Sequence, residues 1–276
     1  MKASTFVVKV LIVGTILVVI QMVLGSVITT SVAIPKNALP WFLLSTLLVA
    51  AVVIVLGMRS DWPSPLRALA LAAIPAVITL NNYLEGIIFL TGSGIDWRKE
   101  ILRTCLLNAI AFPVWMILFR KTESEAGSHY SPLAKPVGEK IWRFAVADLA
   151  YPVLYFVAGT IVFPYIRDFY ATQTLPPFVE LLSVQLFIRG PILVAVCLVM
   201  TRMLGLPRLA GAGAVGLILS ILNGIAPLII PSGVFPDAVR WAHLYETSIS
   251  NFVFGAFVAW VWSKPEGAAQ LASKAA

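Results

Sequence analysis

Eight long apolar stretches, joined by short polar connections, constrain the fold of this chain more than any other feature. Each is close to the roughly 20 residues that a helix needs to cross the hydrocarbon core of a bilayer. A segment in hydrocarbon must satisfy its backbone hydrogen bonds internally, so we expect every stretch to be an α-helix. The sequence therefore predicts an all-α, polytopic integral membrane protein with eight transmembrane helices. The expected spans are residues 6–28, 41–58, 69–90, 101–119, 141–163, 178–200, 209–230 and 241–262.

Composition supports the same class. Hydrophobic residues make up 59% of the 276 residues and charged residues only 12%, whereas a soluble domain carries about 25% charged residues. Tryptophans mark the expected span ends, as rings anchored among lipid headgroups do; they are Trp41, Trp62, Trp97, Trp142, Trp241 and Trp262. The bilayer is thus the first expected partner. Nucleic-acid binding is not expected, because no basic run stands clear of the membrane.

The distribution of basic residues predicts the orientation. Of the 20 lysine and arginine residues, thirteen fall on the side that holds both termini, six on the opposite side, and Arg189 within a span. Since cytoplasmic connections carry the excess of basic residues, both termini are expected in the cytoplasm. We expect a cell membrane, either a plasma membrane or a bacterial inner membrane. The connection between residues 120 and 140 is then a cytoplasmic linker.

The two halves of the chain resemble each other. Thr104 falls on Thr247 and Asn108 on Asn251 at a constant offset of 143, and Asn81 falls on Asn223 at an offset of 142. Several such matches in the same order suggest a tandem duplication. We therefore expect residues 1–134 and 135–276 to form two four-helix repeats. Because four is even, the repeats have the same orientation, a parallel 4+4 arrangement with a binding site between them.

Polar residues inside two expected spans point to that site, because each is costly in lipid and usually faces protein or water. The span 69–90 contains a group of three that lies on neighbouring stripes of one helix. The span 241–262 contains a second group at the same expected depth, in the outer half of the membrane. The two groups are Asn81, Asn82 and Glu85 in the first span, and His243, Glu246, Ser250 and Asn251 in the second.

Two further residues belong to the same candidate substrate-binding site. Arg189 lies near the middle of its expected span, where an unpaired guanidinium is costly, and we expect it within about 4 Å of Glu85 or Glu246. Asn223 precedes Pro227 by four residues, and that proline cannot donate to the carbonyl oxygen of Asn223. Replacing Glu85 by glutamine is expected to abolish activity while leaving the fold largely intact. A purely structural Glu85–Arg189 pair, and asparagines that only join helices, are the alternatives.

Three functions remain open. The favoured one is a secondary transporter or lipid-handling permease, because duplicated halves and proline-broken helices suit alternating access. The second is a membrane-embedded enzyme that uses Glu85 and Glu246 as paired acid and base on a lipid substrate. The third is a non-catalytic subunit of a larger membrane complex, and a protein partner or a second copy of the chain is left open. No metal or other cofactor is expected, because the sequence holds two histidines, two cysteines and no phosphate-binding loop.

Overall fold

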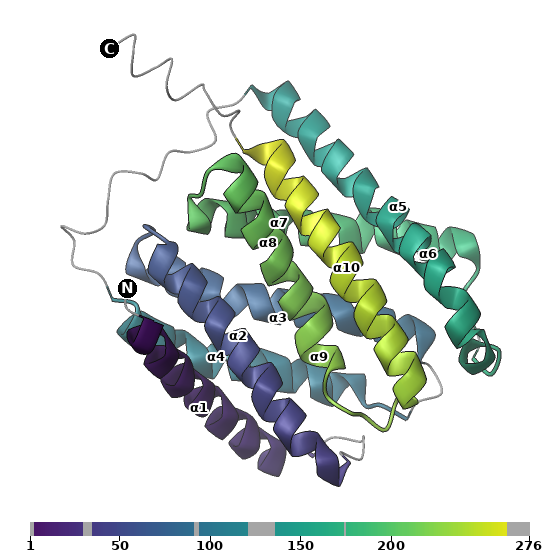
Figure 1. The fold of residues 1–276 in the computed structure, drawn as a ribbon, viewed down its shortest axis with the longest axis horizontal. Coiled ribbons are helices and arrows are strands. Elements are labelled where there is room, and N and C mark those ends of the chain that lie inside the picture. Colours follow the sequence, from purple (N-terminus) through teal and green to yellow (C-terminus); the bar gives the residue numbers. More distant parts are fainter. Residues whose placement is uncertain (1–2, 30–34, 91–93, 121–135, 174, 264–276) are drawn as a thin grey trace.

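The chain is an all-helical membrane protein. The computed structural model describes residues 3–29, 35–90, 94–120, 136–173 and 175–263. These residues form eight long helical segments, of which seven are long and apolar enough to cross a membrane. The segments run alternately in opposite directions, so the start of α1 and the end of α10 lie on the same side of the bundle (Figure 1). The polytopic membrane class predicted from the sequence is thereby confirmed.

The elements follow the expected spans closely. Their bounds are α1 (Ala3–Val27), η1 (Lys36–Ala38), α2 (Leu39–Arg59), α3 (Ser64–Phe89), α4 (Trp97–Leu118), α5 (Val137–Tyr170), α6 (Phe178–Val184), η3 (Gln185–Arg189), α7 (Gly190–Leu204), α8 (Arg208–Ser220), η4 (Ile221–Ile225), α9 (Ala226–Leu228) and α10 (Asp237–Trp262). The largest difference is α5, whose 34 residues extend beyond the expected 141–163 at both ends. The linker 121–135 and the tail 264–276 lie outside the described residues.

Prolines and one glycine explain where many helices begin and end. Five helices start directly after a proline, whose fixed φ and missing N–H suit the first turn; these prolines are Pro63, Pro136, Pro177, Pro207 and Pro236. Helix α7 ends at Gly205, whose φ of 57° lies in the left-handed region that favours glycine. These breaks divide one apolar chain into separate spans.

The eighth expected span remains a prediction. Helix α10 has 26 residues, enough to cross a bilayer, but it is not among the seven apolar segments. It contains His243, Glu246 and Asn251, which line a cavity. Polar side chains that face a cavity lower the apolarity of a helix without exposing charge to lipid.

Two helices contain a π-helical turn. η3 separates α6 from α7, and η4 separates α8 from α9. Each is followed by a proline at the second position of the next segment, Pro191 and Pro227. A π-turn adds one residue to a helical turn and is frequent at functional sites. The sequence indicated a weakened helix at both positions, but not this geometry.

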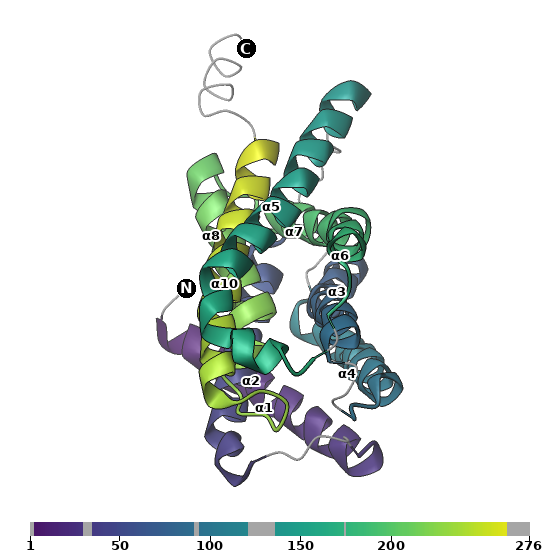
Figure 2. The same cartoon turned by 90° about the vertical axis from the view of Figure 1, so that its right-hand side faces the viewer.

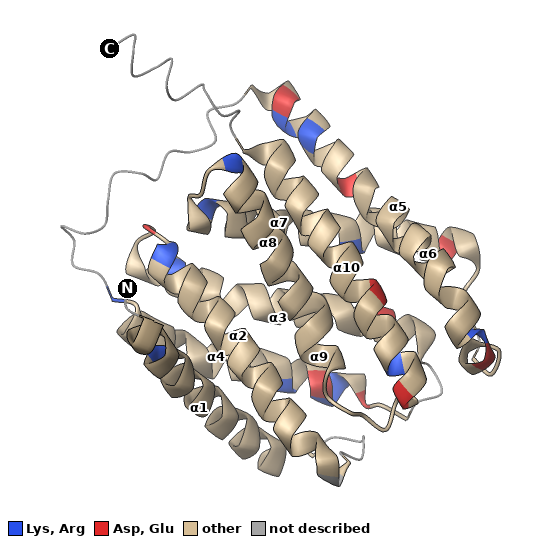
Figure 3. Cartoon of the chain, viewed as in Figure 1, with Lys and Arg blue, Asp and Glu red and all other residues tan. Residues whose placement is uncertain are grey.

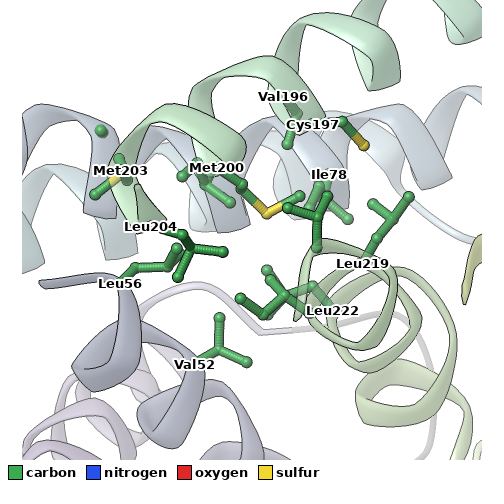
Figure 4. Close-up of a cluster of buried hydrophobic side chains, with 14 of the residues drawn as sticks. Val52, Leu56, Ile78, Val196, Cys197, Met200, Met203, Leu204, Leu219 and Leu222 are labelled. Carbon is green, nitrogen blue, oxygen red and sulfur yellow. The ribbon is translucent and has the colours of Figure 1, made fainter. Parts of the chain in front are cut away.

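The tightest packing lies where four segments cross. Helices α2, α3, α7 and α8 supply a cluster of buried side chains that includes Leu56, Ile78, Met200 and Leu219 (Figure 4). Helices α1, α4 and α5 lie at the periphery and expose most of their side chains, as lipid-facing helices do. Charged residues gather near the two ends of the helices, with few between them (Figure 3). The central core therefore joins residues of both halves of the chain.

The duplication of residues 1–134 and 135–276 also remains a prediction, but several contacts recur in both halves. Helix α3 packs on α4 as α8 packs on α10, and α1 packs on α4 as α5 packs on α10. The Asn108 amide donates to the carbonyl of Thr104 over 2.9 Å, and Asn251 donates to the carbonyl of Thr247 over 2.7 Å. Arg67 donates to the carbonyl of Phe119, after the end of α4, as Arg208 donates to the carbonyl of Trp260, near the end of α10. These recurrences favour a common ancestral unit.

Candidate functional site

A cavity of about 810 Å³ lies between the two halves of the chain. Helices α5 and α10 form one side of it and α3 with the start of α4 the other, an arrangement seen end-on in Figure 2. The wall is completed by η3 and by the connection that follows α9. The lining is rich in aromatic rings, among them Phe89, Trp97, Tyr151, Phe156, Phe235 and Phe254. Eight of the nine residues proposed from the sequence line this cavity.

The first polar group in the wall is built around Arg189. Its Nη2 lies 2.8 Å from Glu85 Oε2, so the ion pair expected from the sequence is present. Nη1 of Arg189 donates to Gln185 Oε1 over 3.1 Å, and the Tyr155 hydroxyl donates to Glu85 Oε1 over 2.8 Å. The guanidinium also lies 5.7 Å and 5.9 Å from the ring centres of Tyr151 and Tyr155. The side chain of Arg189 is 2% exposed and that of Glu85 is 32% exposed, so only the carboxylate faces the cavity broadly.

The π-turn η3 presents Arg189 to the cavity. Gln185 and Arg189 are both buried and lie at its two ends. Gly190 follows directly, and a Cβ there would come within 2.3 Å of Asp148 Oδ1. Only glycine therefore allows α5 and α7 to approach so closely at this level. Arg143, five residues before Asp148 on α5, is bonded elsewhere: its Nη2 lies 2.8 Å from Glu139 and another of its nitrogens donates to the carbonyl of Val261.

The second polar group joins α5 to α10. His243 Nδ1 lies 2.9 Å from Glu246 Oε2, and His243 Nε2 lies 2.9 Å from the Tyr170 hydroxyl. The two ring nitrogens of His243 thus connect the Tyr170 hydroxyl, at the end of α5, with the Glu246 carboxylate on α10. Ser250 follows on the same side of α10, with its hydroxyl bonded to the carbonyl of Glu246 over 2.8 Å.

The asparagines divide into two sets. Asn223 Nδ2 donates to Asn251 Oδ1 over 2.8 Å, and both residues line the cavity. Asn82 lines it from α3. Asn81 does not, which corrects its place in the proposed site. It continues the buried stripe of Ile74 and Ile78 at i, i+4 and i+7, whereas the cavity stripe of α3 is one residue further round the helix.

Sequence reasoning missed the tyrosines of α5 and the glutamine of η3. Tyr155 donates its hydroxyl to Glu85, the Tyr170 hydroxyl bonds His243 Nε2, and Gln185 supplies an acceptor to Arg189. A signal was present, because a glutamine four residues before an intramembrane arginine shares its helix face. The tyrosines give a weaker signal, since tyrosine is also common at membrane interfaces.

Each half of the chain contributes one pair of ionisable residues to the cavity wall, and the order of the acidic and basic residue is reversed between the two pairs. Under the alignment that places Thr104 on Thr247, Glu100 and Arg103 fall on His243 and Glu246. Arg103 Nη2 lies 3.8 Å from Glu100 Oε2, and all four residues line the cavity. Under this alignment the corresponding positions of the two walls differ in charge.

Metal binding finds no support in this geometry. Within the described ranges, three or more histidine, cysteine, aspartate or glutamate side chains nowhere gather as ligands of one ion. Comparison of the chain with protein-family models, curated proteins and solved structures finds no match. The site is therefore interpreted from its own geometry and chemistry.

Proposed function

We propose that this protein is a secondary transporter or lipid-handling permease that takes an amphipathic molecule into the cavity between its halves. The observation that carries the proposal is the cavity itself, with the Glu85–Arg189 and His243–Glu246 groups in its wall. Its volume of about 810 Å³ lies within the roughly 300–1,000 Å³ of small-molecule sites. A structural subunit without a ligand has no need of such a space.

The lining favours an amphipathic ligand. Apolar and aromatic side chains dominate the wall, which suits an alkyl or ring system. The charged groups lie on α3, the start of α4, η3 and α10, which suits a ligand with a polar head. Phe163 and Leu175 line the cavity and are among the exposed large apolar side chains. We expect a ligand dissolved in the bilayer to enter the site beside them.

Transport is favoured by the way in which the halves meet. The cavity separates α3 and α4 from α5 and α10, while the central core joins the halves on its other side. Rocking of one half on this core exposes the cavity alternately to the two membrane faces. The excess of basic residues on the side that holds both termini supports a cytoplasmic location for them. The cavity is then reached from the outer half of a cell membrane.

Reconstitution in vesicles tests this proposal. An alkyltrimethylammonium carrying a nitrobenzoxadiazole dye is placed in both leaflets, and dithionite is added outside to reduce the accessible dye. We expect vesicles containing the protein to expose the inner pool, and the Glu85→Gln variant to do so at least tenfold more slowly. Glu180→Gln is the matched control, because Glu180 is exposed on α6 and outside the cavity lining. Equal rates in protein-containing and empty vesicles refute transport of this class of molecule.

A membrane-embedded enzyme is the second candidate, favoured by the hydrogen-bonded series of Tyr170, His243 and Glu246. An imidazole oriented by a carboxylate is a common arrangement in acid–base catalysis. Mass spectrometry of membrane lipids incubated with the purified protein tests it. A new product that depends on His243 supports the enzyme, and unchanged lipids argue against it.

A further inference from the structure

The charges in the cavity wall are not fully balanced. Glu85 is paired with Arg189, and Glu100 with Arg103. The third lining arginine, Arg240, is occupied elsewhere: its nitrogens contact Asp237 Oδ1 at 2.9 Å and the carbonyls of the α9 end at 3.0 Å and 3.2 Å. Among the described lining residues, Glu246 is the carboxylate that lacks an arginine or lysine partner.

One oxygen of Glu246 has no hydrogen-bond partner among the described residues. Oε2 contacts His243, whereas Oε1 lies on the side of Gly159 on α5. Apart from its own neighbours in α5, a Cβ at position 159 would meet only Oε1, at 3.6 Å, among the described atoms within 4 Å. Both Gly159 and Glu246 line the cavity. The missing side chain at position 159 therefore leaves space between α5 and this oxygen.

The surroundings of Oε1 suit a cation. Tyr155, Phe156 and Phe254 line the same cavity as Glu246, and the faces of aromatic rings attract cations. A carboxylate with one free oxygen supplies the opposite charge. An alkylammonium head fits this combination, and the apolar wall accommodates its chain.

His243 can neutralise the same carboxylate. In its neutral form it donates Nδ1–H to Glu246 and accepts the Tyr170 hydroxyl at Nε2. When one proton from water adds to Nε2, the hydroxyl turns and accepts from it, because a phenol is both donor and acceptor. No bond to Glu246 breaks, and the pair gains one positive charge. Histidine is the side chain best suited to this change in the physiological pH range.

We propose that Glu246 binds the head of an amphiphilic cation and that His243 binds the proton that exchanges with it. This inference rests on the proposed function and names its ligand class and coupling ion. A proton on His243 weakens the attraction of Glu246 for the cation, and a bound cation opposes protonation of His243. By linkage the two effects are equal in size.

The neighbouring charged groups leave this exchange to His243. Tyr155 and Tyr170 face it from α5, Glu85 from α3 and Arg189 from η3, all of them in the cavity wall. Arg240 and Asp237 lie on α10 itself and are bonded to each other. The one charged residue of the α8–η4–α9 segment, Arg208, lies at the other end of α10 against Trp260.

Nuclear magnetic resonance of histidine tests the proton site without any ligand. The chain has two histidines, so a His129→Gln background leaves His243 as the one signal in protein labelled with ¹⁵N-histidine. Spectra are recorded from about pH 8 down to pH 5, the range in which histidine side chains act as switches, and we expect the Nδ1–H tautomer to be replaced by the doubly protonated ring as the pH falls. We expect Glu246→Gln to change this transition, because the carboxylate that contacts the ring is removed. A ring that keeps one protonation state over this range overturns the proposal.

Photo-crosslinking tests the exchange. The probes are a diazirine-bearing dodecyltrimethylammonium, whose charge does not depend on pH, and the matching dodecanol. Below the His243 midpoint, affinity for the cation is expected to fall by about tenfold per pH unit, as for one proton displacing one ligand, while dodecanol binding stays constant. His243→Gln is expected to make the affinity for the cation independent of pH. Glu246→Gln is expected to lower this affinity by about tenfold or more at high pH. Glu180→Gln serves as the control.

The outcomes separate the two proposals. Equal pH profiles for the cation and the alcohol overturn the exchange, even if the dye-labelled amphiphile crosses the membrane. Competitive, pH-dependent binding without movement of that amphiphile supports the exchange site and refutes transport. Failure of both probes to label the cavity refutes both.

Discussion

The unequal burial of Glu85 and Arg189 predicts an asymmetric cost when either partner is removed. Glu85→Gln leaves a guanidinium that is 2% exposed without its counter-charge. Breaking a buried pair in this way costs about 3–5 kcal/mol, and we expect about 3 kcal/mol, because Gln185 and two tyrosine rings still contact Arg189. Arg189→Met leaves a carboxylate that is 32% exposed to the cavity and still bonded to Tyr155. We expect this change to cost roughly half as much.

The double variant is the sharper measurement. Glu85→Gln with Arg189→Met removes both charges, so we expect its stability within about 1 kcal/mol of the original chain. The single variants together cost about 4.5 kcal/mol and the double variant at most about 1 kcal/mol, so the cycle gives a coupling energy of about 3.5–4.5 kcal/mol, above the roughly 0.5–3 kcal/mol of most contacting residues. Unfolding by sodium dodecyl sulfate in mixed micelles, followed by the fluorescence of the eight tryptophans, provides the free energies. Additive single effects, or a larger cost for Arg189→Met than for Glu85→Gln, refute the reasoning.

This measurement also separates stability from function. The sequence led to the expectation that Glu85→Gln leaves the fold largely intact, whereas the burial of Arg189 leads us to expect a measurable cost. If the double variant is stable but does not move the amphiphile, the charges serve the ligand. If it is stable and active, the pair is structural, as the alternative interpretation of the sequence holds.

Three further predictions concern packing and topology. Gly224→Ala places a Cβ 2.9 Å from the backbone nitrogen of Ser248 and should lower the free energy of unfolding by about 1–3 kcal/mol in the same assay. Gly213→Ala places a Cβ that meets no atom within 4 Å apart from its own neighbours in α8 and should leave the free energy of unfolding unchanged, so equal effects of the two changes contradict the close helix contact. Asn223→Ala removes the 2.8 Å bond to Asn251 and should cost about 0.6–1.7 kcal/mol, while Asn108→Ala, whose amide bonds only its own helix, should cost less. Ser128→Cys, in a chain with Cys105→Ser and Cys197→Ala, should react with an impermeant maleimide only from the cytoplasmic side; labelling of intact cells from outside contradicts the predicted orientation.

Much of the membrane architecture could be predicted from the sequence, because it depends on local apolarity and on proline positions. The spans were found within a few residues, except that α5 is longer than its apolar centre. Polar residues within spans also identified one cavity, since burying them in lipid is costly. Eight of nine candidates line it.

The remaining details depend on long-range packing. Asn81 and Asn82 are adjacent in sequence, and only the position of the neighbouring helices decides which of them faces the cavity. The tyrosines of α5 were missed for a similar reason, because their partners lie on α3 and α10. The π-turns change which residues share a face of their helices, and a pattern with 3.6 residues per turn does not reveal them.

The π-turn at Arg189 also bears on how this protein arose. When the halves are aligned, Phe42 falls on Phe178 at an offset of 136 residues, whereas Asn81 falls on Asn223 at an offset of 142. The second half therefore has extra residues between these two matches, and its α6–α7 segment has 27 residues where α2 has 21. The residues of α2 in the corresponding positions, 47–53, are all apolar, and Glu85 falls on Pro227. If the halves descend from one unit, neither member of the ion pair was duplicated. A symmetric dimer of that ancestor would have lacked the pair, and its acquisition after gene fusion would leave each chain with a single ligand site and no second copy to compensate for its loss.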